Sequence, residues 1–160
     1  PCDFLKAMEF QLKRDVEGWK KTKQDDVMSM RTGIMGYKGH IHYHAAPCID
    51  GFLKTLDPDM PKGELFDTIA AHIDKHIHAN YMLYPCNYIA ADMLAGNDAL
   101  AANYTTEDKV AFEQYLMSRL AMIDIPNKDE AFLRERILTM YANPAKNKLA
   151  NELTSKRVDS

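Results

Sequence analysis

The sequence lacks several features by which a function is usually recognised. Its three cysteines, Cys2, Cys48 and Cys86, are odd in number, far apart and without C-x-x-C spacing, so neither a disulfide framework nor a zinc knuckle is indicated. No apolar run approaches the roughly 18 residues that a membrane span needs, and the first residues show no signal-peptide pattern. We therefore expect a cytoplasmic protein, or one held peripherally on the inner face of the membrane.

An excess of positive charge and the common catalytic motifs are missing as well. The net charge is -3 with 27% charged residues, which argues against binding to a phosphate backbone, so we expect no nucleic-acid partner. The serines lie in no G-x-S-x-G elbow, which gives a hydrolase of that type no support. Glycines at 33, 36 and 39 meet neither the P-loop pattern nor the dinucleotide-binding pattern, so they are better explained as turn residues.

Helical periodicity is what the sequence offers most clearly. Its 160 residues, 46% of them hydrophobic, suit one domain that buries a sizeable core. Glu113 lies on the apolar side of its predicted helix, which suggests a buried and paired carboxylate. The clearest repeat predicts a core helix and consists of Phe66, Ile69, Ala70, Ile73 and Ile77. We expect about six helices, near 3–16, 27–34, 64–77, 85–94, 106–122 and 128–141, with a short one after Pro144.

One stretch, GYKGHIHYHAAP at 36–47, departs from this helical pattern. Residues 38–46 alternate apolar side chains with three histidines, which predicts the chain's one β-strand. A lone strand leaves its backbone groups unpaired, so a second copy or a sheet encoded upstream would have to pair with it. The sequence opens PCDF without an initiator methionine, and we expect a piece of a longer protein. Within 1–160 the interval 1–48 holds helices plus the strand, and 62–155 forms the helical portion.

Histidines are the only candidates for metal ligation. His40, His42 and His44 share one strand face, and His72 and His76 are neighbours on one helix at i, i+4. A strand H-x-H is weakly specific, and helical geometry turns the nearby Asp74 and His78 to other sides. The sequence therefore favours no metal site, with His72 and His76 as the weak candidates.

The stretch DKHIHANYMLYPCNYIAADML at 74–94 combines a helix end, a tight turn and a new helix start. Asn80 and Asn87 are placed where their amides can hydrogen-bond exposed backbone groups, and Pro85 suits a first helical turn. Considered alone, these residues indicate a helix-turn-helix corner.

Three stretches in this order resemble the lysophospholipid or 1-acylglycerol-3-phosphate acyltransferase-like branch of the bacterial glycerolipid acyltransferases. They are PCDFLKAMEF, GIMGYKGHIHYH and HIDKHIHANYMLYPCNYIAADML, and they span roughly residues 1–95. The resemblance implies phospholipid biosynthesis: a histidine base, oriented by aspartate in an H-x-x-x-x-D motif, activates a hydroxyl that attacks an acyl thioester. The residue five positions after each histidine here is never aspartate. The resemblance therefore implies a non-catalytic C-terminal fragment of an α/β acyltransferase fold, mainly α in this chain.

The same resemblance carries expectations about ligands and partners. The parent enzyme would use acyl-CoA or acyl-carrier protein as co-substrate, a glycerolipid-like hydroxyl as acceptor, and no cofactor. Lys38 and His40 are the candidates for lining a substrate groove, where their positive or switchable charge would attract a phosphate or coenzyme A. This chain alone would be inactive and would pack on the missing N-terminal catalytic half. Two alternatives stay open: a helical interaction module that dimerises through 38–46, and a histidine metal-binding protein.

Overall fold

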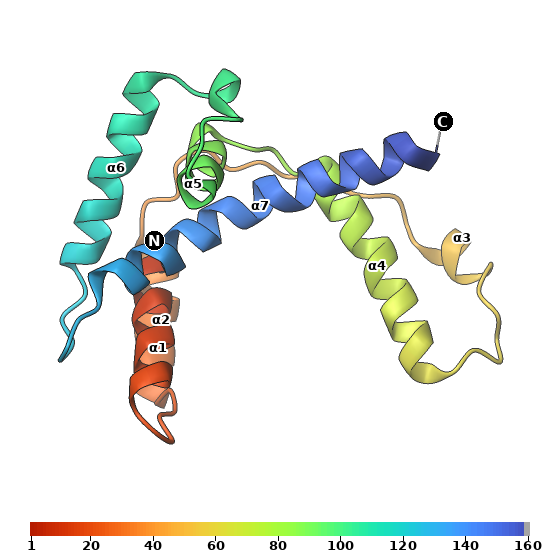
Figure 1. Cartoon of the computed structure of the whole chain (residues 1–160). Coiled ribbons are helices and arrows are strands. Elements are labelled where there is room, and N and C mark those ends of the chain that lie inside the picture. The colour runs from red at the N-terminus through yellow and green to blue at the C-terminus, as the bar shows by residue number, and fades with distance from the viewer. Residues whose placement is uncertain (159–160) are drawn as a thin grey trace. The chain divides into compact units, whose positions relative to one another are not determined.

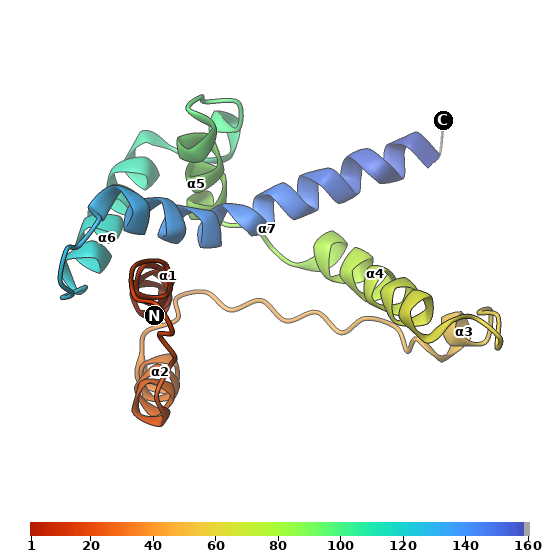
Figure 2. The ribbon, with the colours of Figure 1, turned by 60° about the horizontal axis from the view of Figure 1, so that its bottom comes forward.

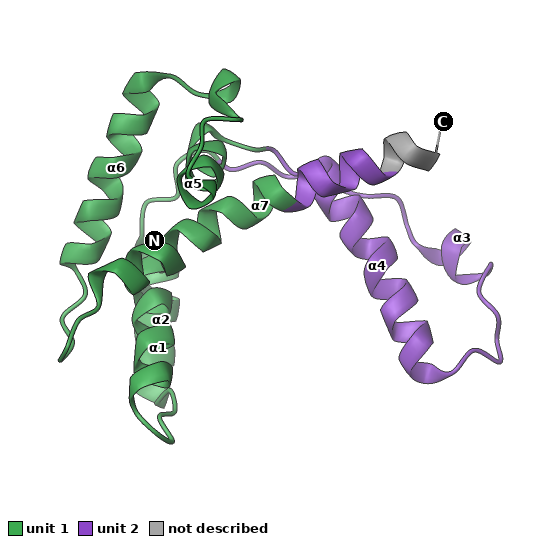
Figure 3. Ribbon diagram, in the orientation of Figure 1, with its two compact units in different colours: residues 1–40, 83–146 green, residues 41–82, 147–160 purple. Residues whose placement is uncertain are grey.

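The computed structural model describes the backbone of residues 1–158 and the side chains of residues 1–154. All regular secondary structure in residues 1–158 is helical (Figure 1). The chain divides into two compact units (Figure 3). Unit 1 contains residues 1–40 and 83–146, and unit 2 contains residues 41–82 and 147–160. The helices are α1 (Asp3–Asp15), α2 (Lys23–Met35), α3 (Asp50–Leu53), α4 (Lys62–Asn80), α5 (Pro85–Ala95), α6 (Thr106–Ala121) and α7 (Glu130–Val158), with a 3₁₀ turn, η1, at Ala101–Asn103.

The strand predicted at 38–46 is wrong, because no strand forms anywhere in residues 1–158. Residues 37–48 form the long connection from α2 to α3 (Figure 2), and their side chains are exposed. A strand exists only through pairing, and this segment lacks a partner strand within the described chain, so water is left to satisfy its peptide groups. The expectation of an α/β fold fragment is therefore wrong as well, and the described chain is all-helical.

Unit 1 is built around a hydrophobic core to which four helices contribute. Leu116, Leu133 and Ile137 are fully buried, and Ile89 is almost so. The remaining core side chains are smaller or lie at the margin: Phe4 and Ala7 of α1, Ala90 and Ala91 of α5, Phe112 and Leu120 of α6, Ile123, and Leu138, Ala142 and Ala145 of α7. Burial of this apolar surface is what holds the four helices together.

The ends of α5 follow the sequence signals closely. Pro85 occupies the first turn, and Gly96 ends the helix with φ +67°, a left-handed conformation that favours glycine. Asn87 satisfies two backbone groups: its Oδ1 accepts from the N–H of Tyr84 at 2.9 Å, and its Nδ2 donates to the carbonyl of Tyr141 at 2.9 Å. The prediction that Asn87 bonds exposed backbone groups is confirmed.

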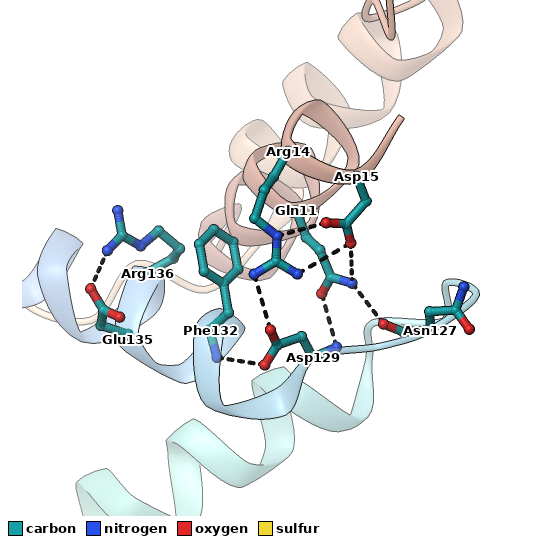
Figure 4. A network of polar contacts seen from close by, with 8 residues as sticks. All are labelled: Gln11, Arg14, Asp15, Asn127, Asp129, Phe132, Glu135 and Arg136. Atoms are coloured by element: carbon teal, nitrogen blue, oxygen red, sulfur yellow. Dashed lines mark hydrogen bonds and ion pairs between the residues drawn. The ribbon is translucent and has the colours of Figure 1, made fainter. Parts of the chain in front are cut away.

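A polar network joins α1 to the segment that leads into α7 (Figure 4). The buried Gln11 donates to the carbonyl of Asn127 at 2.9 Å and accepts from the N–H of Asp129 at 3.0 Å. Asp129 in turn accepts from the N–H of Phe132 and from Arg14, each at 3.0 Å, so it also caps the first turn of α7. Asn127 has φ +53°, which marks a tight reversal that this network holds.

Two expectations about α6 and α7 need correction. Glu113 is paired as predicted, with its Oε1 3.4 Å from Arg134, but its side chain is 47% exposed, so the predicted burial is wrong. The two helices expected on either side of Pro144 form one helix, α7. Proline lacks the N–H that would bond the carbonyl four residues earlier, which weakens a helix without always ending it. The complete burial of Ala142 and Ala145 on either side stabilises the continuous helix.

Unit 2 contains α3, α4 and the last part of α7, and its packing differs from the sequence prediction. The helix predicted near 64–77 is confirmed as α4, but every one of its residues is at least partly exposed. Phe66, Ile73 and Ile77 are 65%, 39% and 50% exposed. Periodicity identifies an apolar face without saying what covers it, and the prediction of a core helix is therefore wrong.

Candidate functional site

Unit 2 contains a hollow between residues 42–49, which we call the extended segment, and the C-terminal half of α4. Its volume is about 240 Å³. The extended segment contributes one wall, and the end of α4 with the residue after it contributes the other; both walls combine aliphatic side chains with histidines. The lining residues are His42, His44, Ala46, Pro47, Ile49, Ile73, His76, Ile77, Asn80 and Tyr81.

Hydrogen bonds at the end of α4 join it to the extended segment, through His42, and to α7, through Lys148. Nε2 of His42 lies 3.2 Å from the carbonyl oxygen of Asn80, and because a carbonyl only accepts, Nε2 carries the hydrogen in this contact. Nζ of Lys148 donates to the carbonyls of Ala79 at 3.2 Å and Tyr81 at 2.9 Å. The last carbonyls of a helix lack intrahelical donors and form the negative end of its dipole, so a lysine and a histidine are well suited to cap them.

The amide of Asn80 has a separate role at this helix end. Its Nδ2 donates to the carbonyl of His76 at 2.8 Å, which confirms the prediction that Asn80 bonds a helix-terminal backbone group. His76 and Asn80 both line the hollow, so this bond lies within its wall. In the stretch 74–94, α4 ends at Asn80 and α5 begins at Pro85.

The chemistry of the hollow is that of an apolar site with a few polar groups at its edge. Ile49, Ile73 and Ile77 offer aliphatic surface, while the imidazoles of His44 and His76 offer hydrogen-bonding atoms beside it. Burial raises the pKa of the Tyr81 phenol despite a hydrogen bond from Lys148, so this group stays neutral and protonated near neutral pH. Ligand sites commonly combine apolar walls with a small number of placed polar groups, and such a site suits an apolar chain that ends in a polar group.

The two substrate-binding candidates from the sequence lie in unit 1, and neither lines the hollow. Nζ of Lys38 donates to the carbonyls of Ile34 at 2.8 Å and Gly36 at 2.9 Å, so this lysine caps the end of α2. The ring of His40 is stacked against Tyr84, with 6.2 Å between the ring centroids. Both residues therefore have structural contacts.

The metal candidates are neighbours, as the i, i+4 spacing predicts. The rings of His72 and His76 lie edge to face with their centroids 4.8 Å apart. The ring of Phe52 stacks on His72 at 3.7 Å and nearly parallel, which covers one face of this imidazole. Among the residues that the structure describes, no group of three or more His, Cys, Asp or Glu side chains is arranged to hold a metal ion.

The sequence does not predict the hollow, because one of its walls has a helical repeat and the other an alternating pattern. The repeat predicts Ile73 and Ile77 in a core, whereas they form part of the wall. The alternation predicts His42 and His44 on one face of a strand, whereas they line the same hollow as His76. The alternation of His42 and His44 is a usable signal for a common face, but it does not indicate that this face meets the end of α4.

Comparisons with protein-family models, with curated proteins and with solved structures find no match to this chain. None of the helices in the described part of the chain combines the length and the apolar character that crossing a bilayer requires.

Proposed function

We propose that this chain is the helical, non-catalytic part of an acyltransferase that moves an acyl chain from acyl-CoA or acyl-carrier protein to a glycerolipid hydroxyl. Its contribution is to hold an acyl chain, of donor or acceptor, in the hollow of unit 2. The aliphatic wall of this hollow, formed by Ile49, Ile73 and Ile77, is the observation that carries the proposal. The three stretches that resemble glycerolipid acyltransferases support it from the side of the sequence.

Acyl binding follows from the physical properties of the lining. Each methylene removed from water favours binding by about 0.8 kcal/mol, and the isoleucines provide the apolar surface that this transfer needs. The imidazoles of His44 and His76 lie at the same site, where a carbonyl or phosphate oxygen at the end of the chain would find hydrogen-bond donors. An acyl ester satisfies both requirements, which a purely polar ligand does not.

In this proposal, the histidine–aspartate pair that catalyses the reaction lies outside this chain. The sequence contains no H-x-x-x-x-D, so the general base that activates the acceptor hydroxyl belongs to a catalytic partner segment. Because the acceptor is a glycerolipid, the proposal places the chain in the cytoplasm at the inner face of the membrane. The hollow would raise the effective concentration of the acyl group near that catalytic pair.

Binding of a soluble lysophosphatidic acid, kept below its micelle concentration, tests the proposal. Ile77→Glu puts a carboxylate into the aliphatic wall and is expected to abolish binding, because burying an unpaired charge is costly. Phe66→Glu is the matched control, since it changes a 65% exposed residue of the same helix that is not part of the lining. Isothermal titration calorimetry measures both variants beside the unchanged protein.

Two results would contradict the proposal. The first is absence of binding by the unchanged protein, with circular dichroism confirming that it is folded. The second is equal binding by the unchanged protein and by Ile77→Glu, which would place the ligand outside the hollow.

A further inference from the structure

The helix α2 turns its small and polar side toward the rest of unit 1. Sγ of Cys2 donates to the carbonyl of Ser29 at 3.2 Å, and Nζ of Lys21 donates to the Ser29 hydroxyl at 3.2 Å. A Cβ added to Gly33 would lie 3.4 Å from the Cys2 sulfur, and one added to Gly36 would lie 2.5 Å from Pro1. The start of the chain therefore packs on the glycine-bearing side of α2.

The opposite side of α2 is apolar and faces outward. Val27, Met30, Ile34 and Met35 are 64%, 65%, 70% and 79% exposed. With about 100° between successive helical residues, Val27, Met30 and Ile34 fall on one side of the helix. Two shallow hollows on the protein surface confirm the grouping, because one is lined by Val27, Met30, Arg31, Ile34 and Met35 and the other by Lys23, Gln24, Val27, Met28 and Arg31. A helix on a globular protein normally buries its apolar side chains, whereas those of α2 are exposed.

We call this outward side the α2 outer face, and it consists of Lys23, Val27, Met30, Arg31, Ile34 and Met35. All charges on the α2 outer face are positive. Its two charged residues are Lys23 and Arg31. Asp25 is turned away and forms the N-terminal capping box with Thr22. Asp26 pairs with Lys21 at 3.1 Å, on the side toward α1. The α2 outer face therefore combines exposed aliphatic side chains with uncompensated positive charge.

We propose that the α2 outer face docks the protein on a membrane that contains anionic lipids, with α2 lying in the plane of the interface. A bilayer surface presents negative headgroups directly above an apolar layer, which matches cations with long stems beside aliphatic side chains. A second copy of the chain is a poorer occupant, because a symmetric contact would gather the lysine and the arginine of both α2 outer faces at one interface, and neither face contains a carboxylate. The surface and the lipid class both go beyond the acyl-binding function of unit 2.

Co-sedimentation with lipid vesicles tests this proposal directly. We expect the protein to pellet with vesicles of phosphatidylcholine and phosphatidylglycerol, and to bind vesicles of phosphatidylcholine alone far less. Lys23→Gln combined with Arg31→Gln is expected to lower the partition coefficient by about thirtyfold, and added salt is expected to lower that of the unchanged protein. Lys62→Gln combined with Lys75→Gln removes the same charge from exposed positions of α4 and should leave most of the binding intact.

A second pair of variants separates the apolar contribution from the charge. Ile34→Glu is expected to reduce binding to anionic vesicles about tenfold or more, because it places a carboxylate where an aliphatic side chain would insert. Val110→Glu introduces the same change at a 53% exposed position of α6 and is the matched control. Circular dichroism shows that each variant is folded before it is compared.

The outcomes are distinct. No binding of the unchanged protein to anionic vesicles, or equal losses in Ile34→Glu and Val110→Glu, would overturn the proposal. Self-association without vesicles that is lost in Ile34→Glu would overturn it in favour of a second copy. Binding of monomeric lysophosphatidic acid by unit 2 is measured separately, so failure of this proposal leaves the acyl-binding function standing, and the reverse also holds.

Discussion

The hydroxyl oxygens of Tyr115 on α6 and Tyr141 on α7 lie 2.8 Å apart inside unit 1. Both phenols also reach Oδ2 of Asp3, at 2.6 Å from Tyr115 and 2.8 Å from Tyr141. Two phenol protons are thus shared among three short oxygen–oxygen contacts. Through these contacts the Asp3 carboxylate of α1 is joined to α6 and α7. Asp3, the first residue of α1, is therefore a polar junction of the core.

Tyr141→Phe tests the strength of this junction. The substitution removes one donor from the poorly exposed Asp3 carboxylate, and we expect a loss of about 1–3 kcal/mol in the free energy of unfolding. Tyr37→Phe is the control, because this residue is 92% exposed, and it should change the free energy by less than about 0.5 kcal/mol. Urea denaturation followed by circular dichroism measures both. Equal stability of the two variants would show that the junction contributes nothing.

Stability should fall at alkaline pH. Burial raises the pKa of Tyr141 and Tyr115, with the Asp3 contact acting in the same direction, and the hydrogen bond to Asp92 raises the pKa of Tyr104 to about 12. In the unfolded chain a phenol ionises near pH 10, so the unfolded state loses its protons first. Below about pH 10 these protonated phenols therefore contribute fully to the free energy of unfolding, and this contribution is lost as the pH rises toward 12. Ultraviolet titration in which all tyrosines ionise near pH 10 while the protein stays folded would contradict this.

Asp92, in the IAADML stretch, holds the loop that follows α5. Its carboxylate is 3% exposed and accepts from the N–H of Leu100 at 3.0 Å and from the hydroxyl of Tyr104 at 2.8 Å. Asp92→Asn is expected to cost about 2 kcal/mol of unfolding free energy and to lower the pKa of Tyr104. Asp98→Asn is the matched control, since that side chain is 70% exposed and should change stability little. A Tyr104 titration that is the same in both variants would refute the role of Asp92.

The helix start predicted at Thr106 agrees with the structure, in which α6 begins at that residue. Thr105, directly before it, is the N-cap and forms a capping box with Asp108. Thr105→Ala is expected to lower the unfolding free energy by about 1 kcal/mol, while Thr106→Ala, within the first turn, should cost much less. Thermal unfolding of the two variants makes the comparison, and a greater loss in Thr106→Ala would contradict the capping role of Thr105.

Local signals predicted the helices well. Pro85 and Gly96 mark the limits of α5, and the repeat through Ile73 and Ile77 identifies α4, because a helix is largely decided by residues within a few positions of one another. The capping box of Thr22 and Asp25 at the start of α2 is an equally local signal, but the prediction begins this helix only near 27. The start of α2 is therefore missed by a few residues, where charged residues precede the apolar ones.

Properties that depend on distant residues were not predictable in the same way. Alternation in 38–46 indicated a strand, but a strand needs a neighbour, and the residues that His42 contacts belong to the end of α4. The apolar face of α4 indicated burial, but which surface covers a face depends on the tertiary arrangement. The hollow and the Asp3 junction combine residues that are distant in the sequence. The grouping on the α2 outer face follows from helical periodicity, but its exposure appears only after folding.

The acyl-chain specificity of unit 2 tests the central claim most directly. Isothermal titration with lysophosphatidic acids of increasing chain length should show affinity rising about fourfold for each added methylene, as expected for about 0.8 kcal/mol of transfer free energy. The rise should level off when the hollow of about 240 Å³ is filled, and it should be absent in Ile77→Glu. An affinity that does not depend on chain length would contradict the claim that the hollow holds an acyl chain.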